Sequence, residues 1–310
     1  MFSDKISDLF TAQVTEWQLA GDNYRLLQKV KTRHFDFGGF EVLVQFNPER
    51  MVSSAAKVDS GSVGSRPCFL CQKNRPPLQR GVRFESDFTV LVNPFPIFNR
   101  HLTIPSDEHT DQRIRYNFGK MLSLAESLPA YIIFYNGPEC GASAPDHFHF
   151  QAGNRDLIPL EKDFSSGRFA EIIFSRKGVE VWLWRNYLRG IISLSSAGRE
   201  PLETMFHMIF ERFSALQPGL PEPMMNILTY KTGQSWIVHI IPRKQHRPAQ
   251  YSAEGKDRLI ISPASVDLGG VVITPREEDF RKITTGDMTD IFRQVCWPDD
   301  ELHHVISDLK

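Results

Sequence analysis

The stretch Gly141-Ala142-Ser143-Ala144-Pro145-Asp146-His147-Phe148-His149-Phe150-Gln151 decides how the rest of the sequence is interpreted. It starts as a glycine-bearing turn and ends in alternating polar and aromatic residues, a strand pattern that puts His147, His149 and Gln151 on one face. Ring nitrogens on that face would lie beside backbone N–H groups and the Ser143 hydroxyl, a combination suited to holding phosphate. The stretch therefore predicts a site for phosphoryl chemistry.

Helical and strand periodicities predict the elements upstream of this stretch. The expected elements are a helix from Lys5 to Gln18 ended by Gly21-Asp22-Asn23, strands over Tyr24–Arg33 and Phe40–Phe46, a loop over Ser53–Arg66, strands over Phe88–Asn93 and His101–Ile104, a helix over Asp111–Leu128, and a buried strand over Ala130–Tyr135.

The second half of the chain repeats the order helix, strand, turn and His-bearing strand. A helix is expected over Pro201–Leu216 and strands over Met225–Tyr230 and Ser235–Ile241, the last carrying His239. The second copy lacks the paired histidines and the glutamine, so we expect it to support the first copy. The order predicts an α+β fold of two related halves, each an antiparallel sheet with packed helices. We place the boundary between residues 1–160, which carry the motif, and 161–310.

Four cysteines occur among 310 residues, and two of them form the pair Cys68-Phe69-Leu70-Cys71. So close a pair is poor material for a disulfide framework and more typical of a metal or redox site. Two ordinary buried thiols are the alternative.

The run from Gly141 to Gln151 resembles the signature of the transferase branch of the histidine-triad superfamily, which includes galactose-1-phosphate uridylyltransferase, diadenosine tetraphosphate phosphorylase and GDP-hexose phosphorylases. The resemblance implies a histidine-triad-like fold in each half. It also implies catalytic roles for His149, which would attack the α-phosphate and carry the nucleotide, and for Gln151, which would contact phosphoryl oxygens. The hydrolase branch has a third histidine at the position of Gln151. Because an amide cannot donate a proton to a leaving group as histidine does, the glutamine favours transfer or phosphorolysis.

The same resemblance implies a structural zinc ion held by Cys68, Cys71, His109 and His147. Two thiolates and two imidazoles suit a closed tetrahedral zinc site, which would fix the backbone next to the nucleophile. Spacing alone does not choose among the histidines and cysteines. The competing ligands are His34, His101 and Cys140.

Four further residues are expected to bind substrate. The segment Glu85-Ser86-Asp87-Phe88 resembles the nucleoside-contacting segment of the uridylyltransferases, which assigns Asp87 to the ribose or base. Asn136, Gly141 and Ser143 match family positions near the phosphates. Asp87 as a solvated loop carboxylate and Asn136 as a turn-stabilising residue are the alternatives.

Two features concern the substrate class. Residues 261–280 resemble GDP-hexose phosphorylases, whereas Asp146 is an extra residue relative to the uridylyltransferase pattern and argues against sugar-1-phosphate exchange. The cluster Arg243, Lys244, His246 and Arg247 could meet a phosphate, although a solvated basic loop is the interpretation that we favour.

Bulk composition excludes several classes of protein. With 36 basic and 37 acidic residues, the net charge of −1 provides no overall excess of positive charge for binding nucleic acid. Any phosphate site must therefore depend on a local group of basic residues. No stretch has the length or hydropathy of a membrane span or a secretory signal, and we expect a cytoplasmic location. A homodimer is compatible with the sequence.

The sequence thus predicts a nucleotidyltransferase or phosphorylase that acts on a nucleotide sugar of the GDP-hexose or UDP-hexose type through a nucleotidyl-His149 intermediate, with inorganic phosphate or a sugar phosphate as acceptor. The enzymatic alternative is a phosphorylase or hydrolase of a dinucleotide polyphosphate such as a diadenosine polyphosphate. A non-catalytic, zinc-stabilised nucleotide-binding protein is the alternative of another class.

Overall fold

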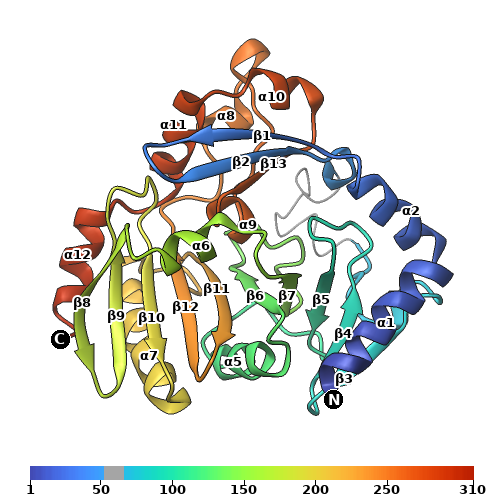
Figure 1. The fold of residues 1–310 in the computed structure, drawn as a ribbon, viewed down its shortest axis with the longest axis horizontal. Helices are drawn as coiled ribbons and strands as arrows, with labels where there is room; N and C mark the ends of the chain where they lie inside the picture. The colour runs from blue at the N-terminus through green and yellow to red at the C-terminus, as the bar shows by residue number, and fades with distance from the viewer. Residues whose placement is uncertain (52–65) are drawn as a thin grey trace.

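A ten-stranded antiparallel sheet forms the centre of the protein in the computed structural model, which describes residues 1–51 and 66–310 (Figure 1). Its strand order is β3-β4-β5-β7-β6-β11-β12-β10-β9-β8. The loop predicted over Ser53–Arg66 lies, apart from Arg66, outside the described residues. Within the described ranges, no helix has both the length and the apolar character needed to cross a bilayer.

The strands of the sheet come from two consecutive stretches of chain. The first stretch gives β3 (Gly81–Phe84), β4 (Phe88–Val92), β5 (His101–Pro105), β6 (Tyr131–Asn136) and β7 (His149–Asn154). The second gives β8 (Ala170–Arg176), β9 (Val179–Trp184), β10 (Ile192–Ser196), β11 (Met225–Thr232) and β12 (Ser235–Pro242).

The two stretches have the same topology, which confirms the expected fold of two related halves. In each, three strands in sequence are followed by a helix and two further strands, and the last strand pairs with the third: β7 with β5, and β12 with β10. The halves meet where β6 pairs with β11, Asn136 opposite Asn226, so that two antiparallel half-sheets form one continuous sheet.

Both faces of this sheet are covered. Helices α5 (Phe118–Ser127) and α7 (Arg199–Leu216) pack on one face. A three-stranded sheet lies over the other side (Figure 1), formed by β1 (Lys31–Asp36), β2 (Glu41–Phe46) and β13 (Val271–Thr274), with β13 parallel to β2. The strand β13 therefore returns the C-terminal part of the chain to the N-terminal part.

Further helices frame these sheets. They are α1 (Phe2–Glu16), α2 (Gln18–Leu27), α6 (Pro159–Ser165), α8 (Ala249–Ser252), α9 (Ser265–Leu268), α10 (Glu277–Lys282), α11 (Thr285–Val295) and α12 (Asp299–Ser307), with 3₁₀ turns at Pro48–Arg50, Gln72–Asn74 and Gly255–Asp257.

One strand and two helix boundaries differ from the expectation. The strand expected over Tyr24–Arg33 is wrong in most of its length, because the residues up to Leu27 belong to α2 and β1 starts only at Lys31. The segment Gly21-Asp22-Asn23 does not end a helix but lies inside α2, because α2 packs closely on α1: a Cβ at Gly21 would lie 2.5 Å from the carbonyl oxygen of Val14. The helix expected from Asp111 begins only at Phe118. The preceding residues are held irregular by side-chain hydrogen bonds of Gln112 and Glu222.

Candidate active site

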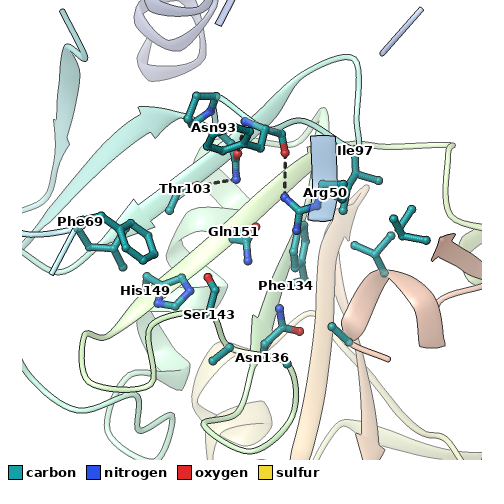
Figure 2. Close-up of a pocket in the computed structure, with 18 of the residues that line it drawn as sticks. Arg50, Phe69, Asn93, Ile97, Thr103, Phe134, Asn136, Ser143, His149 and Gln151 are labelled. Atoms are coloured by element: carbon teal, nitrogen blue, oxygen red, sulfur yellow. Dashed lines mark hydrogen bonds between the residues drawn. The ribbon is translucent and has the colours of Figure 1, made fainter. Parts of the chain in front are cut away.

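A pocket of about 420 Å³ lies beside β6 and β7, and His149 and Gln151 line it (Figure 2). Alternation along β7 produces this arrangement, because Phe150 and Ala152 pack into the core under α5 while the two polar side chains face the opposite side. His147 does not share that face as expected. It precedes β7, in a turn closed by a hydrogen bond from its N–H to the Ala144 carbonyl.

The His149 ring is oriented with one nitrogen available to the pocket. Its Nδ1 donates to the carbonyl oxygen of His147 at 2.8 Å, which leaves the lone pair of Nε2 for the pocket. Burial lowers the pKa of His149 to about 4. The ring is therefore neutral at pH 7, as a nucleophile must be.

Gln112 fixes the backbone of the same residue, a role that sequence reasoning missed. The Gln112 side chain is fully buried, accepts from His149 N–H at 2.8 Å and donates to the His149 carbonyl at 3.0 Å. It also donates to the carbonyl of Asn136. One amide thus ties together the ends of β6 and β7 at the site.

His101 determines which end of the Gln151 amide faces the pocket. The Nδ1 of His101 accepts from the Ile97 N–H at 3.1 Å, so the proton is on Nε2, which lies 3.0 Å from Gln151 Oε1. Burial lowers the pKa of His101 to about 3, and the charge of Arg50 adds to the effect. The Gln151 oxygen is occupied as an acceptor, and the NH₂ group is left to face the pocket.

The glycine-bearing turn supplies the remaining polar groups. Gly141, Ser143 and Asn136, three of the four residues expected to bind substrate, all line the pocket. Gly141 has φ +93°, and a Cβ there would lie 2.6 Å from the Cβ of Ala264, so both conformation and space require glycine. The Oδ1 of Asn136 accepts from the backbone and hydroxyl of Ser265, which turns its nitrogen toward the pocket (Figure 2).

Arginines line the pocket from three separate segments. Among the residues that the structure describes, they are Arg50, Arg66 and Arg247, against one lining carboxylate, Asp267. Burial lowers the pKa of Arg50 to about 10, so it remains charged at pH 7. A chain with a net charge of −1 thus concentrates positive charge where a phosphate would bind.

The basic cluster after β12 is not the solvated loop that we favoured. Arg243 is fully buried and donates to the carbonyl oxygens of Pro263, Gln245 and His246, while His246 and Arg247 line the pocket. Burial and the neighbouring arginines lower the pKa of His246 to about 4, so Arg247 carries the charge.

Asp87, which was expected to bind substrate, does not line this pocket. It lies in the turn between β3 and β4, where its carboxylate is 3.0 Å from Lys120 Nζ. Asn93 and Phe95, after the other end of β4, line the pocket instead. The Asn93 side chain donates to Thr103 Oγ1 and accepts from the Phe95 N–H, which fixes that loop (Figure 2).

The four residues expected as metal ligands come together. The ligand atoms of Cys68, Cys71, His109 and His147 all lie within 4.8 Å of one another. Sulfur to nitrogen distances are 3.3 Å for Cys68 to His147 and 3.2 Å for Cys71 to His109. A tetrahedral zinc ion with ordinary bond lengths would separate such atoms by about 3.6 Å, so the donor set fits the ion.

Hydrogen bonds behind the ligands agree with this role. The Nε2 of His147 is 2.9 Å from the Ser106 carbonyl, so it carries the proton and Nδ1 is free for a metal. Asp146, the extra residue of the motif, lies 3.5 Å from the far nitrogen of His109. The competing candidates His34, His101 and Cys140 are outside the cluster.

The histidine at the corresponding place in the second half is enclosed by its described neighbours. His239 of β12 is fully buried, and its Nδ1 is 2.7 Å from the Ser193 hydroxyl. Phe164 of α6 and Trp184 pack against its ring. The second half therefore fills with aromatic side chains the space that the first half leaves for the pocket.

Comparison with solved structures identifies a shared fold. The structure of yeast Ap4A phosphorylase Apa2 in complex with Ap4A matches with a TM-score of 0.59 and 16% identity, over 91% of this chain and 97% of that one. The complex of the same enzyme with AMP matches with a TM-score of 0.57 and 16% identity, over 88% and 92%. The chain therefore has the fold of this phosphorylase.

Family models match the two halves of the chain separately. Residues 9–154 match a domain of unknown function (DUF4922), and residues 165–310 match the GDPGP1-like, C-terminal domain. No curated protein matches the sequence.

Proposed function

We propose that this protein transfers the nucleotidyl group of a nucleotide sugar, of the GDP-hexose or UDP-hexose type, to inorganic phosphate through a nucleotidyl-His149 intermediate. The observation that carries the proposal is the buried, neutral His149 ring, whose Nδ1 is bonded to the His147 carbonyl while Nε2 is left for the pocket. In the first step Nε2 attacks the α-phosphorus and the sugar phosphate leaves.

The groups around His149 provide the electrostatic part of the mechanism. The NH₂ group of Gln151, the Ser143 hydroxyl and the Asn136 nitrogen are directed at the developing charge on the phosphoryl oxygens. Arg50 adds a positive charge in the same pocket. Because these donors are positioned before the substrate binds, they need little reorganisation during the reaction.

We propose zinc as the metal of the Cys68, Cys71, His109 and His147 cluster. Bound there, the ion would supply structural rigidity, because all four positions are taken by protein and none is left for substrate. His147 would then link the ion to His149 through its own carbonyl.

Both comparisons and sequence bear on the substrate. The GDPGP1-like match over residues 165–310, with the resemblance of residues 261–280 to GDP-hexose phosphorylases, favours a nucleotide sugar. The similarity to an Ap4A phosphorylase across 91% of the chain makes a dinucleotide polyphosphate the second candidate. The pocket arginines suit the phosphate chain of either substrate.

The test is to trap the intermediate. Purified protein is incubated with α-phosphate-labelled nucleotide sugars and dinucleotide polyphosphates without acceptor, and the adduct is located by intact mass and peptide mapping. We expect a nucleotide on His149, none on His149→Ala, and a rate two to three powers of ten lower for Gln151→Ala. His34→Ala, an exposed histidine on β1, is the control.

Nucleotide transfer by purified His149→Ala would disprove the mechanism. Tight nucleotide binding by metal-loaded wild-type protein, without any adduct from the panel, would instead support a non-catalytic binding protein.

A further inference from the structure

The turn after β12 holds Arg247 at the pocket. Arg243 donates to the carbonyls of Gln245 and His246 at 3.1 and 2.8 Å, which fixes the backbone that leads to Arg247. The Nε of Arg247 donates to the Ser262 hydroxyl at 3.1 Å, and its guanidinium lies 4.1 Å from the Tyr251 ring centroid. Its position is therefore set before any ligand binds.

Arg66 approaches the same pocket from the metal-binding side. Its guanidinium donates to the Ser143 carbonyl at 2.7 Å and lies 5.3 Å from the Phe69 ring centroid. The Nε of Arg66 is buried and has no hydrogen-bond partner among the described residues. Such an atom is costly to bury unless a ligand satisfies it.

Both arginines are connected to the turn from Gly141 to Ser143, one directly and one through residues 262–264. Arg66 contacts Ser143 directly. Arg247 is anchored to Ser262, two residues before Ala264, which packs against Gly141. Because His149 lines the pocket beside this turn, a phosphate held between the arginines would be next to the reacting α-phosphorus.

We propose that Arg66 and Arg247 form a second anion subsite, which holds the β-phosphate of the donor in the first half-reaction and inorganic phosphate in the second. This inference rests on the proposed function. In a double displacement at one phosphorus, the leaving group and the acceptor occupy the same side of the intermediate. Guanidinium groups suit both, because they bind phosphate oxygens in a bidentate manner.

The second half-reaction needs no general acid to protonate a leaving group. An oxygen of inorganic phosphate forms a bond to the α-phosphorus while the bond from phosphorus to His149 Nε2 breaks, and its electron pair returns to Nε2. His149 keeps its own Nδ1 proton, bonded to the His147 carbonyl, throughout. The product is a nucleoside diphosphate whose terminal phosphate lies at Arg66 and Arg247.

The experiment distinguishes loss of phosphate binding at the subsite from loss of the nucleophile's reactivity. A nucleoside 5′-phosphorimidazolide has no β-phosphate, so it should charge His149 in wild type, Arg247→Gln and Arg66→Gln at similar rates. Discharge of the preformed adduct is then followed against the concentration of inorganic phosphate. We expect half-saturation to rise about tenfold to hundredfold in each variant, with partial recovery in Arg247→Lys.

Lys244→Gln is the matched control, because it removes the same charge from the same turn at an exposed residue that does not line the pocket. Equal phosphate dependence in wild type, Arg247→Gln and Arg66→Gln would overturn the subsite. Discharge by a hexose 1-phosphate but not by inorganic phosphate would refute inorganic phosphate as the acceptor, which belongs to the proposed function. Absence of any adduct in wild type would refute the proposed function instead.

Discussion

At the scale of single residues, the site depends on buried side chains that have no reactive role of their own. Gln112 holds both backbone groups of His149, and His101 leaves Gln151 only one useful orientation of its amide. An amide turned by 180° would present oxygen to the phosphate and repel it. Residues of this kind determine whether the catalytic groups are correctly aimed.

We expect His101→Phe to slow adduct formation on His149 about tenfold or more, because nothing then prevents the Gln151 amide from turning. Nucleotide affinity should change much less. A double-mutant cycle checks the cause: in a Gln151→Ala background the His101 substitution should have no further effect on the rate. Additive effects of the two substitutions would contradict a role through Gln151, and thermal unfolding monitors folding.

A second prediction at this scale concerns the two ends of β4. Asp87→Asn should leave the Michaelis constant for the nucleotide unchanged, because Asp87 pairs with Lys120 outside the pocket. Asn93→Ala should raise it about tenfold, because the loop that carries Phe95 loses two hydrogen bonds. Steady-state kinetics of both variants is the measurement. A larger increase of the Michaelis constant in Asp87→Asn than in Asn93→Ala would show that Asp87 binds substrate.

At the scale of elements, the sequence predicted those helices and strands whose positions are determined by local sequence pattern. The strand β2, the two copies of helix and paired strands, and the motif around His149 all follow from periodicity and turn residues. The strand expected over Tyr24–Arg33 was wrong, because most of that segment belongs to α2 or to the link before β1. The extension of α2 through Gly21 was not predictable, because it depends on contact with Val14. The delayed start of α5 likewise depends on Gln112 and Glu222, whose partners are distant in the sequence.

The metal cluster is an element whose contribution can be measured directly. Cys71→Ser should lose the bound metal and lower the Tm by about 5–10 °C, because metal binding stabilises only the folded chain. Adduct formation should fall with it, since His147 would no longer be fixed next to His149. Elemental analysis and thermal unfolding are the measurements. Cys140→Ala, at a buried thiol outside the cluster, is the control; equal metal content in Cys71→Ser would refute the assignment.

At the scale of the whole molecule, the pocket is completed by contacts that no local pattern shows. Residues after β12 bring Arg247 and Asp267 to a site whose motif lies a hundred residues earlier, and β13 adds to the N-terminal sheet. From the sequence we expected Arg243 to be solvated. Its five hydrogen-bond acceptors come from four separate segments of the chain, so no local pattern indicates that it is buried. The sequence could therefore indicate the chemistry of the site but not all of its lining.

Stability of the whole molecule should decrease as pH rises, because of Glu222. This carboxyl is buried between the Tyr135 hydroxyl and the Ile114 N–H, and burial raises its pKa from 4.5 to about 7. Below pH 4.5 the group is protonated in both the folded and the unfolded chain. Between pH 4.5 and 7 the unfolded chain releases the proton while the folded chain keeps it, so stability falls by about 3 kcal/mol.

Glu222→Gln removes this titration and can keep both hydrogen bonds, because its oxygen can accept from Ile114 while its nitrogen donates to Tyr135. Urea unfolding at pH 5 and pH 8 should therefore show a smaller loss of stability in the variant than in wild type. Asp267, whose pKa burial raises to about 6, leaves a residual slope below that pH in both proteins. The same pH dependence in wild type and variant would show that Glu222 is ionised in the folded chain already at pH 5.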